Sequence, residues 1–318
     1  MNKYPIDKDF KALTKFKSPL NFFGILISRL FWWLMPKGKK NPLVTTKKLK
    51  LTNPYDGGKF SALLFEKRIN KSGANAQSQQ DERDLQQKTP CLVYFHGGAF
   101  VFVPVWAHYN NARDFVAKTG LKVLLVRYRL APKHKYPLGV KDSVYSYKYI
   151  YDNAKALNID ACRLAIGGDS AGGFMAIETA KYAIEELGSV PKLLALIYPV
   201  MTDEMKTESM QKFVDTPVWN AKLNKKMWQL FANGKKVDRV NEWEGFKDVP
   251  YIYVETAEFD CLLGEGEDFA RRFKNCDNCN VVYNPTKGTV HGYDVISKSR
   301  ITKDSMEKRV EILKKSLG

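Results

Sequence analysis

The sequence predicts an α/β protein whose central sheet is mostly parallel and is covered by helices on both faces. Short apolar runs recur along the chain, separated by segments with helical periodicity. These runs do not alternate with polar residues, which is typical of parallel strands buried on both faces. They lie at residues 91–95, 122–128, 163–167, 192–199, 251–256 and 280–284. A length of 318 residues with 44% hydrophobic content fits one large packed domain with an appendage, or two smaller domains.

Two alternating segments precede these runs and predict a β-hairpin. Residues 44–53 and 60–67 alternate apolar and polar positions around a turn rich in Pro, Asp and Gly. The stretch that follows, 70–88, is polar and poor in apolar residues. We therefore expect an exposed loop with no catalytic duty there.

The stretch from Met201 to Gly245 interrupts the alternation of strands and helices. It contains many charges and no clear strand, so we interpret it as an inserted helical lid that the apolar N-terminal segment completes. We expect its aromatic residues to be exposed: Phe213, Trp219, Trp228, Phe231 and Trp243. The chain then divides into an N-terminal helical cap segment (1–43), the first part of the core (44–200), the inserted cap helices (201–245) and the second part of the core (246–318).

The charge of the chain is concentrated at its N-terminus. The net charge is +17, and residues 1–50 contain 12 Lys or Arg against two acidic residues, Asp7 and Asp9. Such an excess favours anionic partners. No nucleic-acid-binding motif accompanies it, and no predicted strand interleaves basic and aromatic residues, so we expect no nucleic-acid partner.

Cysteine usage indicates a reducing compartment. The five cysteines are an odd number without the spacing of a disulfide framework, which predicts a cytoplasmic location. Cys276 and Cys279 form a C-x-x-C pair, but no second pair completes a zinc site. We expect reduced thiols and no metal.

Residues 19–36 are the most apolar part of the chain, and two alternatives explain them. The run ends in bulky residues without a small-residue cleavage site, so a secretory signal is not expected. It is shorter than the roughly 20 residues of a membrane span, and Arg29 interrupts it. One alternative is a helix packed on the protein, which we favour because covering a cleft is the commoner use of such a segment. The other is an interfacial helix, with Trp and Phe at the headgroups and lysines on anionic lipid, which would bring residues 1–40 to a membrane surface.

The stretch RLAIGGDSAGG (163–173) predicts a nucleophile. A strand runs into a segment with helical periodicity (174–187), and Ser170 lies between them in the pattern G-x-S-x-G. Side chains at Gly168 and Gly172 would collide in so tight a turn. The turn lifts the Ser170 Oγ out of the sheet to a helix N-terminus, where a developing negative charge is favoured. A dinucleotide loop or a Walker loop would need a different glycine spacing.

A serine nucleophile needs a base, and chain order selects it. A G-x-S-x-G turn of this kind is followed first by the acid and then by the histidine. The chain has four histidines, and only His291 lies late enough, just beyond the last predicted strand; the others are His96, His108 and His134. We expect His291 to be the base.

The acid that orients His291 should follow the preceding strand. The segment YIYVETAEFD ends in Asp260, a few residues beyond a predicted strand and on the ligand side of the sheet. Glu255 and Glu258 are the rivals. We favour Asp260 for its position in the loop.

Backbone donors for an oxyanion are predicted after another strand. His96, Gly97, Gly98 and Ala99 follow the run 91–95, and glycine backbone can closely approach a carbonyl oxygen. We expect the N–H groups of Gly97 and Gly98 to act with that of Ala171, which follows the nucleophile.

Five of these motifs together resemble one family. HGGAF (96–100), YRLAPKHKYP (128–137), GDSAGG (168–173), AEFD (257–260) and VHGY (290–293) follow, in order, the motifs of the hormone-sensitive-lipase-like branch of the α/β-hydrolases, the bacterial acetyl-esterase-like carboxylesterases. The resemblance covers about residues 90–300. It implies an α/β-hydrolase core with a helical cap, made from the N-terminal segment and an insertion after the sixth strand.

The resemblance also implies a function. It implies a serine carboxylesterase for short acyl esters, with Ser170, Asp260 and His291 as the triad and oxyanion donors at Gly97, Gly98 and Ala171. It gives Asp169 a supporting role in the loop network and calls for no cofactor. Two alternatives are kept: a membrane-surface lipase or deacylase that docks through the N-terminal segment, and an idle ligand-binding protein, against which the intact triad argues. Cap and edge surfaces often associate in this family, so a homodimer is also kept open.

Two positions depart from the family pattern. Ala99 replaces the usual third glycine of the HGGG motif. The usual Asp-Pro-Leu-Arg after the acid is Asp260-Cys261-Leu262-Leu263, so we expect the local support of Asp260 to differ.

Overall fold

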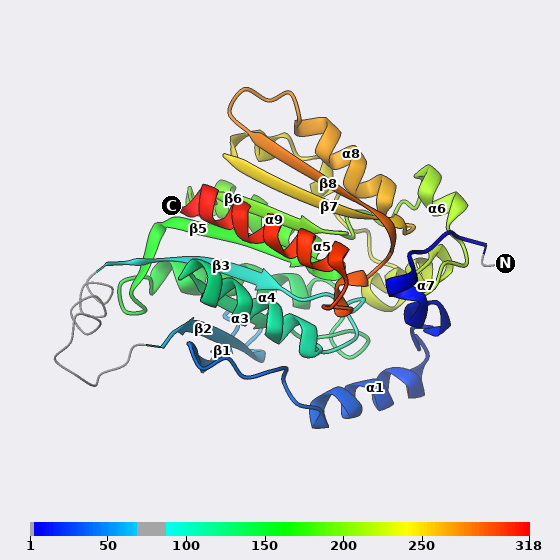
Figure 1. Ribbon diagram of the computed structural model, residues 1–318. Helices are drawn as coiled ribbons and strands as arrows, with labels where there is room; N and C mark the ends of the chain where they lie inside the picture. Colours follow the sequence, from blue (N-terminus) through cyan, green and yellow to red (C-terminus); the bar gives the residue numbers. More distant parts are fainter. Residues whose placement is uncertain (1–2, 69–86) are drawn as a thin grey trace.

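The computed structural model describes residues 3–68 and 87–318 of the chain (Figure 1). Its centre is one sheet of eight strands in the order β1-β2-β4-β3-β5-β6-β7-β8. The strands are β1 (Val44–Thr52), β2 (Lys59–Lys67), β3 (Thr89–Phe95), β4 (Lys122–Arg127), β5 (Ile159–Asp169), β6 (Leu193–Ile197), β7 (Tyr251–Phe259) and β8 (Asn280–Val290). The predicted α/β class and every predicted strand are confirmed. The predicted loop at 70–88 lies outside the described residues except for its last two.

The strand directions place the carboxyl ends of six strands at one edge of the sheet. β1 and β2 form the predicted antiparallel hairpin, and β2 is also antiparallel to β4. From β4 to β8 all neighbouring strands are parallel. In open sheets of this kind, ligands bind outside the carboxyl ends of the strands.

Helices cover both faces of the sheet and create two cores. α3 (Trp106–Thr119) and α9 (Arg300–Leu317) lie on one face, while α4 (Leu138–Asp152), α5 (Ala171–Leu187) and α8 (Leu263–Phe273) lie on the other. Successive residues of a strand therefore enter different cores: Leu92 and Tyr94 face α3, and Val93 and Phe95 face α5. Because both faces are covered, the strands carry no polar alternation.

The stretch between β6 and β7 forms the cap. It contains α6 (Glu208–Lys212), α7 (Ala221–Ala232) and two short 3₁₀ turns, η2 (Val240–Glu242) and η3 (Glu244–Asp248). As expected, no strand of the sheet comes from residues 201–245.

The expectation that the cap aromatics are exposed is wrong. Phe213, Trp219, Trp228 and Phe231 are buried, and Trp243 is half-buried. The Phe231 ring stacks on Phe100 of the core with centroids 3.8 Å apart. These rings are buried because they form the contact between cap and core, which local composition does not reveal.

The N-terminal segment crosses the cap side of the molecule. It contains a 3₁₀ helix, η1 (Lys8–Lys15), and α1 (Phe22–Leu34). Lys17 forms an isolated bridge with Val218, and Ser18 Oγ donates to the Val218 carbonyl at 2.7 Å, so this segment meets the insertion. The four-part division of the chain stays a prediction, and its two cap segments lie side by side.

The five cysteines are all free thiols, Cys276 and Cys279 included. Among the described helices, none is long and apolar enough to cross a membrane.

Replacing Phe231 tests the contact between cap and core. Phe231→Ala removes a ring that is 1% exposed and packed on Phe100, Phe174 and Trp228. We expect a loss of about 3 kcal/mol in the free energy of unfolding, measured by urea denaturation, because a cavity replaces the ring. Gln229→Ala on the exposed side of α7 is the matched control. A loss no larger than the control's would contradict the packing role.

Candidate active site

Ser170 lies on a tight turn between the central strand β5 and α5. Its φ of 53° is in the left-handed region, which a non-glycine residue adopts only when its surroundings impose it. The Ser170 N–H donates to the Ile197 carbonyl at 2.9 Å, and the Ser170 carbonyl accepts from Gly173 and Val200. The turn is thus held by β6 and by the first turn of α5.

Gly168 and Gly172, on either side of Ser170, are required because neighbouring backbone atoms approach them closely. A Cβ at Gly168 would lie inside van der Waals contact of the Gly172 carbonyl. A Cβ at Gly172 would meet the Phe95 carbonyl at the end of β3 in the same way. The predicted collision at these two positions is confirmed.

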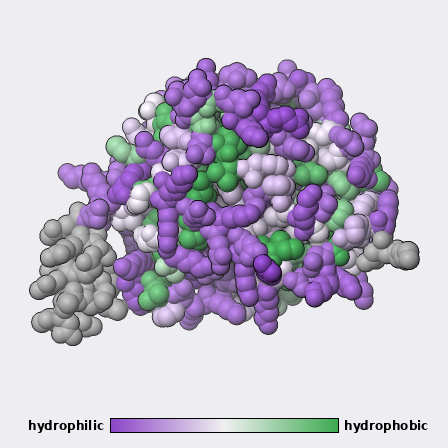
Figure 2. All heavy atoms as spheres, turned by 45° about the horizontal axis from the view of Figure 1, so that its top comes forward, coloured by the Kyte–Doolittle hydropathy of each residue, from purple (hydrophilic) through white to green (hydrophobic). Residues whose placement is uncertain are grey.

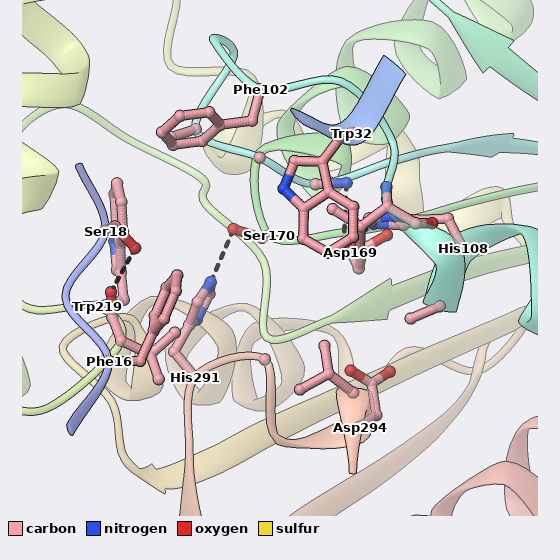
Figure 3. Close-up of a pocket in the computed structure, with 18 of the residues that line it drawn as sticks. Phe16, Ser18, Trp32, Phe102, His108, Asp169, Ser170, Trp219, His291 and Asp294 are labelled. Atoms are coloured by element: carbon pink, nitrogen blue, oxygen red, sulfur yellow. Dashed lines mark hydrogen bonds and ion pairs between the residues drawn. The ribbon is translucent and has the colours of Figure 1, made fainter. Parts of the chain in front are cut away.

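A hydrogen-bonded chain connects Ser170 to a buried carboxylate. His291 Nε2 lies 2.8 Å from Ser170 Oγ (Figure 3). On the other side of the ring, His291 Nδ1 lies 2.6 Å from Asp260 Oδ2. All three side chains are buried. Asp260 follows β7 and His291 follows β8, so the parallel sheet brings three residues distant in sequence to one edge. The structure brings the three predicted triad residues together.

The hydrogen bonds of Asp260 determine which tautomer His291 adopts. Asp260 Oδ1 accepts the N–H of Leu262 at 3.0 Å, which leaves Oδ2 for the imidazole. With a carboxylate at Nδ1, the histidine holds its proton there and presents Nε2 as an acceptor to Ser170. Cys261, which departs from the family pattern, and Leu262, which matches it, are both fully buried, and the Leu262 amide supports Asp260.

The two rival carboxylates lie elsewhere. Glu255 is buried in an ion pair with Arg309 and accepts from Tyr253 and Tyr293. Glu258 accepts the N–H of Gly288 at 2.7 Å. Neither has a recorded contact with His291.

Asp169, next to the nucleophile, joins three elements. Its Oδ2 accepts the Gly97 N–H at 2.9 Å and lies 3.2 Å from His108 Nε2, while its Oδ1 accepts the Tyr94 hydroxyl at 2.9 Å. Burial alone would raise the pKa of Asp169, but His108 and the hydrogen bonds outweigh it and the pKa is lowered. The carboxylate therefore ties the glycine loop, α3 and β3 to the elbow.

The prediction that Gly97 supplies an oxyanion donor is wrong. Its single amide proton already points at Asp169. The amides of Gly98, Ala99 and Ala171 donate to no acceptor within residues 3–68 and 87–318. Gly98 and Ala99 have φ values of 115° and 55°, so the loop turns sharply here and these N–H groups are left without backbone partners. Ala171 is the first residue of α5, whose N–H has no intrahelical acceptor.

Two further side chains support the site and were not expected from the sequence. The Tyr198 ring contacts His291 edge to face at 4.9 Å, and its hydroxyl donates to Asp294 at 2.6 Å. Asp294 also accepts from Arg309 at 2.8 Å, which anchors the loop after His291. A third side chain, His108, is excluded as the base by chain order, and only the fold brings it to Asp169.

A cavity of about 340 Å³ opens above Ser170. In Figure 3, Trp219 and Phe16 lie beside His291, while Phe102 and Trp32 face them across the nucleophile. The lining comes from three parts of the chain: the N-terminal segment (Phe16, Trp32), the insertion (Trp219) and the core (Phe102, His108, Val295). Most of these side chains are apolar, so the cavity suits a small, mainly apolar ligand with one polar group at Ser170.

Comparisons with known proteins agree with this architecture. A family described as α/β hydrolase fold matches residues 92–295. The chain is 28% identical over 217 residues to the esterase LipI of Mycobacterium tuberculosis, covering 65% of this chain and 67% of LipI. It is 32% identical over 142 residues to an ethyl acetate hydrolase of Pseudomonas putida, covering 44% and 45% of the two chains.

Solved structures share the fold over nearly the whole chain. A bacterial heroin esterase superposes with a TM-score of 0.82 at 23% identity, covering 99% of this chain and 98% of that one. An esterase of Pyrobaculum calidifontis has a TM-score of 0.72 at 25% identity and covers 86% of both chains. With 99% of this chain covered, the likeness to the heroin esterase includes the cap as well as the sheet.

The pairing of His108 with Asp169 predicts a pH-dependent stability. Burial alone would lower the pKa of His108, but Asp169 outweighs it and the pKa is raised above 6.5. Nδ1 lies 2.9 Å from the Val105 N–H and 3.3 Å from its carbonyl, so it accepts when neutral and donates when protonated. A raised pKa contributes stability that is complete below the unfolded value and is lost as pH rises through the folded value.

We therefore expect His108→Gln to lose most stability near about pH 6, and less toward about pH 9, in urea denaturation. Gln retains a donor for Asp169 but does not titrate. His134→Gln is the matched control, because burial, followed by Arg129, lowers the pKa of His134 and gives the opposite slope. A pH-independent difference for His108→Gln would contradict the ion pair.

Proposed function

Because the chain belongs to the hormone-sensitive-lipase-like branch of the α/β-hydrolase family, we propose that it is a serine carboxylesterase for short-chain acyl esters. Its class, a carboxylic ester hydrolase, follows from the family and from relatives named esterases. The observation that supports the proposal most is the chain of hydrogen bonds Ser170–His291–Asp260 at the floor of an apolar cavity.

The reaction starts with proton transfer from Ser170. His291 Nε2 takes the hydroxyl proton as Oγ attacks the ester carbonyl, and Asp260 holds the imidazolium that forms. The tetrahedral intermediate collapses when His291 returns the proton to the departing alcohol, which leaves an acyl group on Ser170. A water molecule, deprotonated by the same histidine, then attacks the acyl-enzyme and releases the acid.

Three backbone N–H groups stabilise the oxyanion in this proposal. Gly98 and Ala171 keep the roles expected from the sequence, and Ala99 takes the place of Gly97. Because these amides are preorganised at a buried position, they need not reorganise as charge develops on the carbonyl oxygen. Removing one such donor in other serine hydrolases costs roughly 10²–10³ in turnover.

Asp169 and His108 are positioning residues. The bond from the Gly97 amide to Asp169 holds the glycine loop against the elbow, so that Gly98 and Ala99 lie near Ser170. When protonated, His108 neutralises the carboxylate, which would otherwise oppose the negative charge of the oxyanion.

The cavity favours short acyl chains. A volume of about 340 Å³ is at the lower end of ligand pockets, and Trp219 and Phe16 limit it beside His291. An ester with a small acid and a small or aryl alcohol fits this volume better than a long-chain lipid.

Ser170→Ala tests the nucleophile. We expect turnover of p-nitrophenyl acetate to fall by roughly 10³–10⁶, because the triad acts as a unit and only binding and the oxyanion donors remain. Ser316→Ala, on α9 far along the chain, should keep full activity. Labelling of Ser170 by a fluorophosphonate, mapped by peptide mass spectrometry, tests the same point independently. Near-wild-type hydrolysis by Ser170→Ala would refute the proposal, and an unlabelled, inactive wild type would favour a ligand-binding protein.

Trp219→Ala tests which residue limits the length of the substrate's acyl chain. The ring lies 5.9 Å from that of His291 and lines the cavity, so its removal makes room for a longer substrate. We expect the kcat/KM ratio of p-nitrophenyl octanoate to acetate to rise about tenfold. The ratio is insensitive to the folded fraction. Trp243→Ala, which removes a cap tryptophan outside the cavity lining, is the matched control and should leave it unchanged. A ratio that stays constant in Trp219→Ala would show that another wall sets the limit.

A further inference from the structure

α1 turns its apolar side chains away from the protein. Nine large apolar residues between 22 and 35 are exposed, with 38% to 72% of each residue's surface accessible: Phe22, Phe23, Leu26, Ile27, Leu30, Phe31, Trp33, Leu34 and Met35. We call this set the α1 outer face. In a helix at the surface of a globular protein, the apolar stripe normally faces the core. Contiguous exposure of this kind marks an interaction site.

The inner side of α1 contains the only charge of the helix. Ile25, Ser28, Arg29 and Trp32, spaced as one helical face, are buried or half-buried. Arg29 turns toward the core and donates to the carbonyls of Val101 and Ala131. Arg29 interrupts the apolar run in the sequence, but in the structure it does not interrupt the apolar surface of the helix. The outer face is left with no charged residue.

Basic residues surround the outer face in sequence, and acidic residues are absent. From Phe10 to Tyr55 the chain contains ten Lys or Arg and no Asp or Glu. Lys15 and Lys17 precede α1, and Lys37, Lys39 and Lys40 follow it, all exposed. Two backbone contacts, from Arg113 to the Lys37 carbonyl and from the Lys39 amide to Asn110, hold the following segment on α3.

We propose that the α1 outer face docks the protein on the surface of an anionic lipid bilayer. Apolar and aromatic side chains would enter the headgroup boundary, and the flanking lysines would contact anionic headgroups. A second copy of the chain fits less well, because it would bring two uniformly basic segments together. With 13 residues, α1 is about 20 Å long and lies along the bilayer rather than across it.

The placement of α1 links docking to the cavity. Ser28 and Trp32, on the inner side of the helix, line the cavity above Ser170. α1 lies at one edge of the molecule (Figure 1), whereas the face in Figure 2, seen with the top of Figure 1 turned forward, is mostly hydrophilic. Docking through α1 would therefore place the cavity wall at the lipid boundary, where an ester dissolved in the interface could enter. This consequence, unlike the docking itself, rests on the proposed esterase function.

The test is co-sedimentation of the full chain with vesicles. We expect wild type to bind vesicles of equal parts phosphatidylcholine and phosphatidylglycerol at low salt, and to bind phosphatidylcholine alone much less. Ile27→Gln/Leu30→Gln should lower partitioning about tenfold by removing apolar burial. Lys39→Gln/Lys40→Gln should lower it by a similar factor and weaken its dependence on salt.

Matched controls separate docking from folding and catalysis. Lys314→Gln/Lys315→Gln removes an adjacent exposed pair on α9 and should bind like wild type. Ile27→Gln/Leu30→Gln should keep the thermal midpoint and the hydrolysis of soluble p-nitrophenyl acetate, since neither residue lines the cavity. Ser170→Ala should still bind vesicles, so failure of the proposed function and failure of docking give different results.

Two outcomes would overturn the proposal. One is wild type that stays in the supernatant with anionic vesicles, or an α1 variant that binds as strongly as wild type. The other is a wild-type dimer in sedimentation velocity that the α1 variant abolishes, with no vesicle binding; the outer face would then be an interface between copies of the chain.

Discussion

The tight turn at Ser170 is the constraint on which the rest of the site depends. Ser170 adopts a left-handed backbone conformation because β5 must end and α5 must begin within one residue. The strain is sustained by hydrogen bonds to β6 and by close packing of Gly168 and Gly172 against the end of β3. In return, the Oγ stands clear of the sheet at the N-terminus of α5. A side chain at either glycine would push the elbow out of reach of His291.

Around this turn, the parallel sheet brings residues that are far apart in the sequence close together. β3, β5, β7 and β8 deliver the glycine loop, the nucleophile, the acid and the histidine to one edge. Asp169 then couples the glycine loop, β3 and α3 to the turn at Ser170, since one carboxylate holds the Gly97 amide, Tyr94 and His108. The first consequence of this coupling is conformational. The Gly97 amide is engaged by Asp169, and the loop presents the amides of Gly98 and Ala99 instead. The second is electrostatic, because His108, when protonated, offsets a buried negative charge one residue from the nucleophile.

The cap closes this edge with two kinds of apolar surface. The insertion packs Trp228 and Phe231 against Phe100 and Phe174, and its Trp219 lines the cavity above Ser170. The N-terminal segment contributes walls on its inner side and an apolar face on its outer side. Because Arg29 is drawn inward by two main-chain carbonyls, the helix that lines the cavity also offers an uncharged surface to its surroundings.

The sequence by itself determined the strands, their mostly parallel orientation and the places of Ser170, Asp260 and His291. These are local or ordered signals: an apolar run has a length and a period, a glycine pair allows one kind of turn, and chain order excludes three histidines. Only the tertiary structure decided that the Gly97 amide belongs to Asp169, that His108 lies beside it, and that the cap aromatics are buried. It also decided which side of α1 faces outward. Each of these depends on the direction of a side chain or a proton across elements far apart in sequence. For α1, the amphipathic composition is the same whether protein or lipid covers its apolar side.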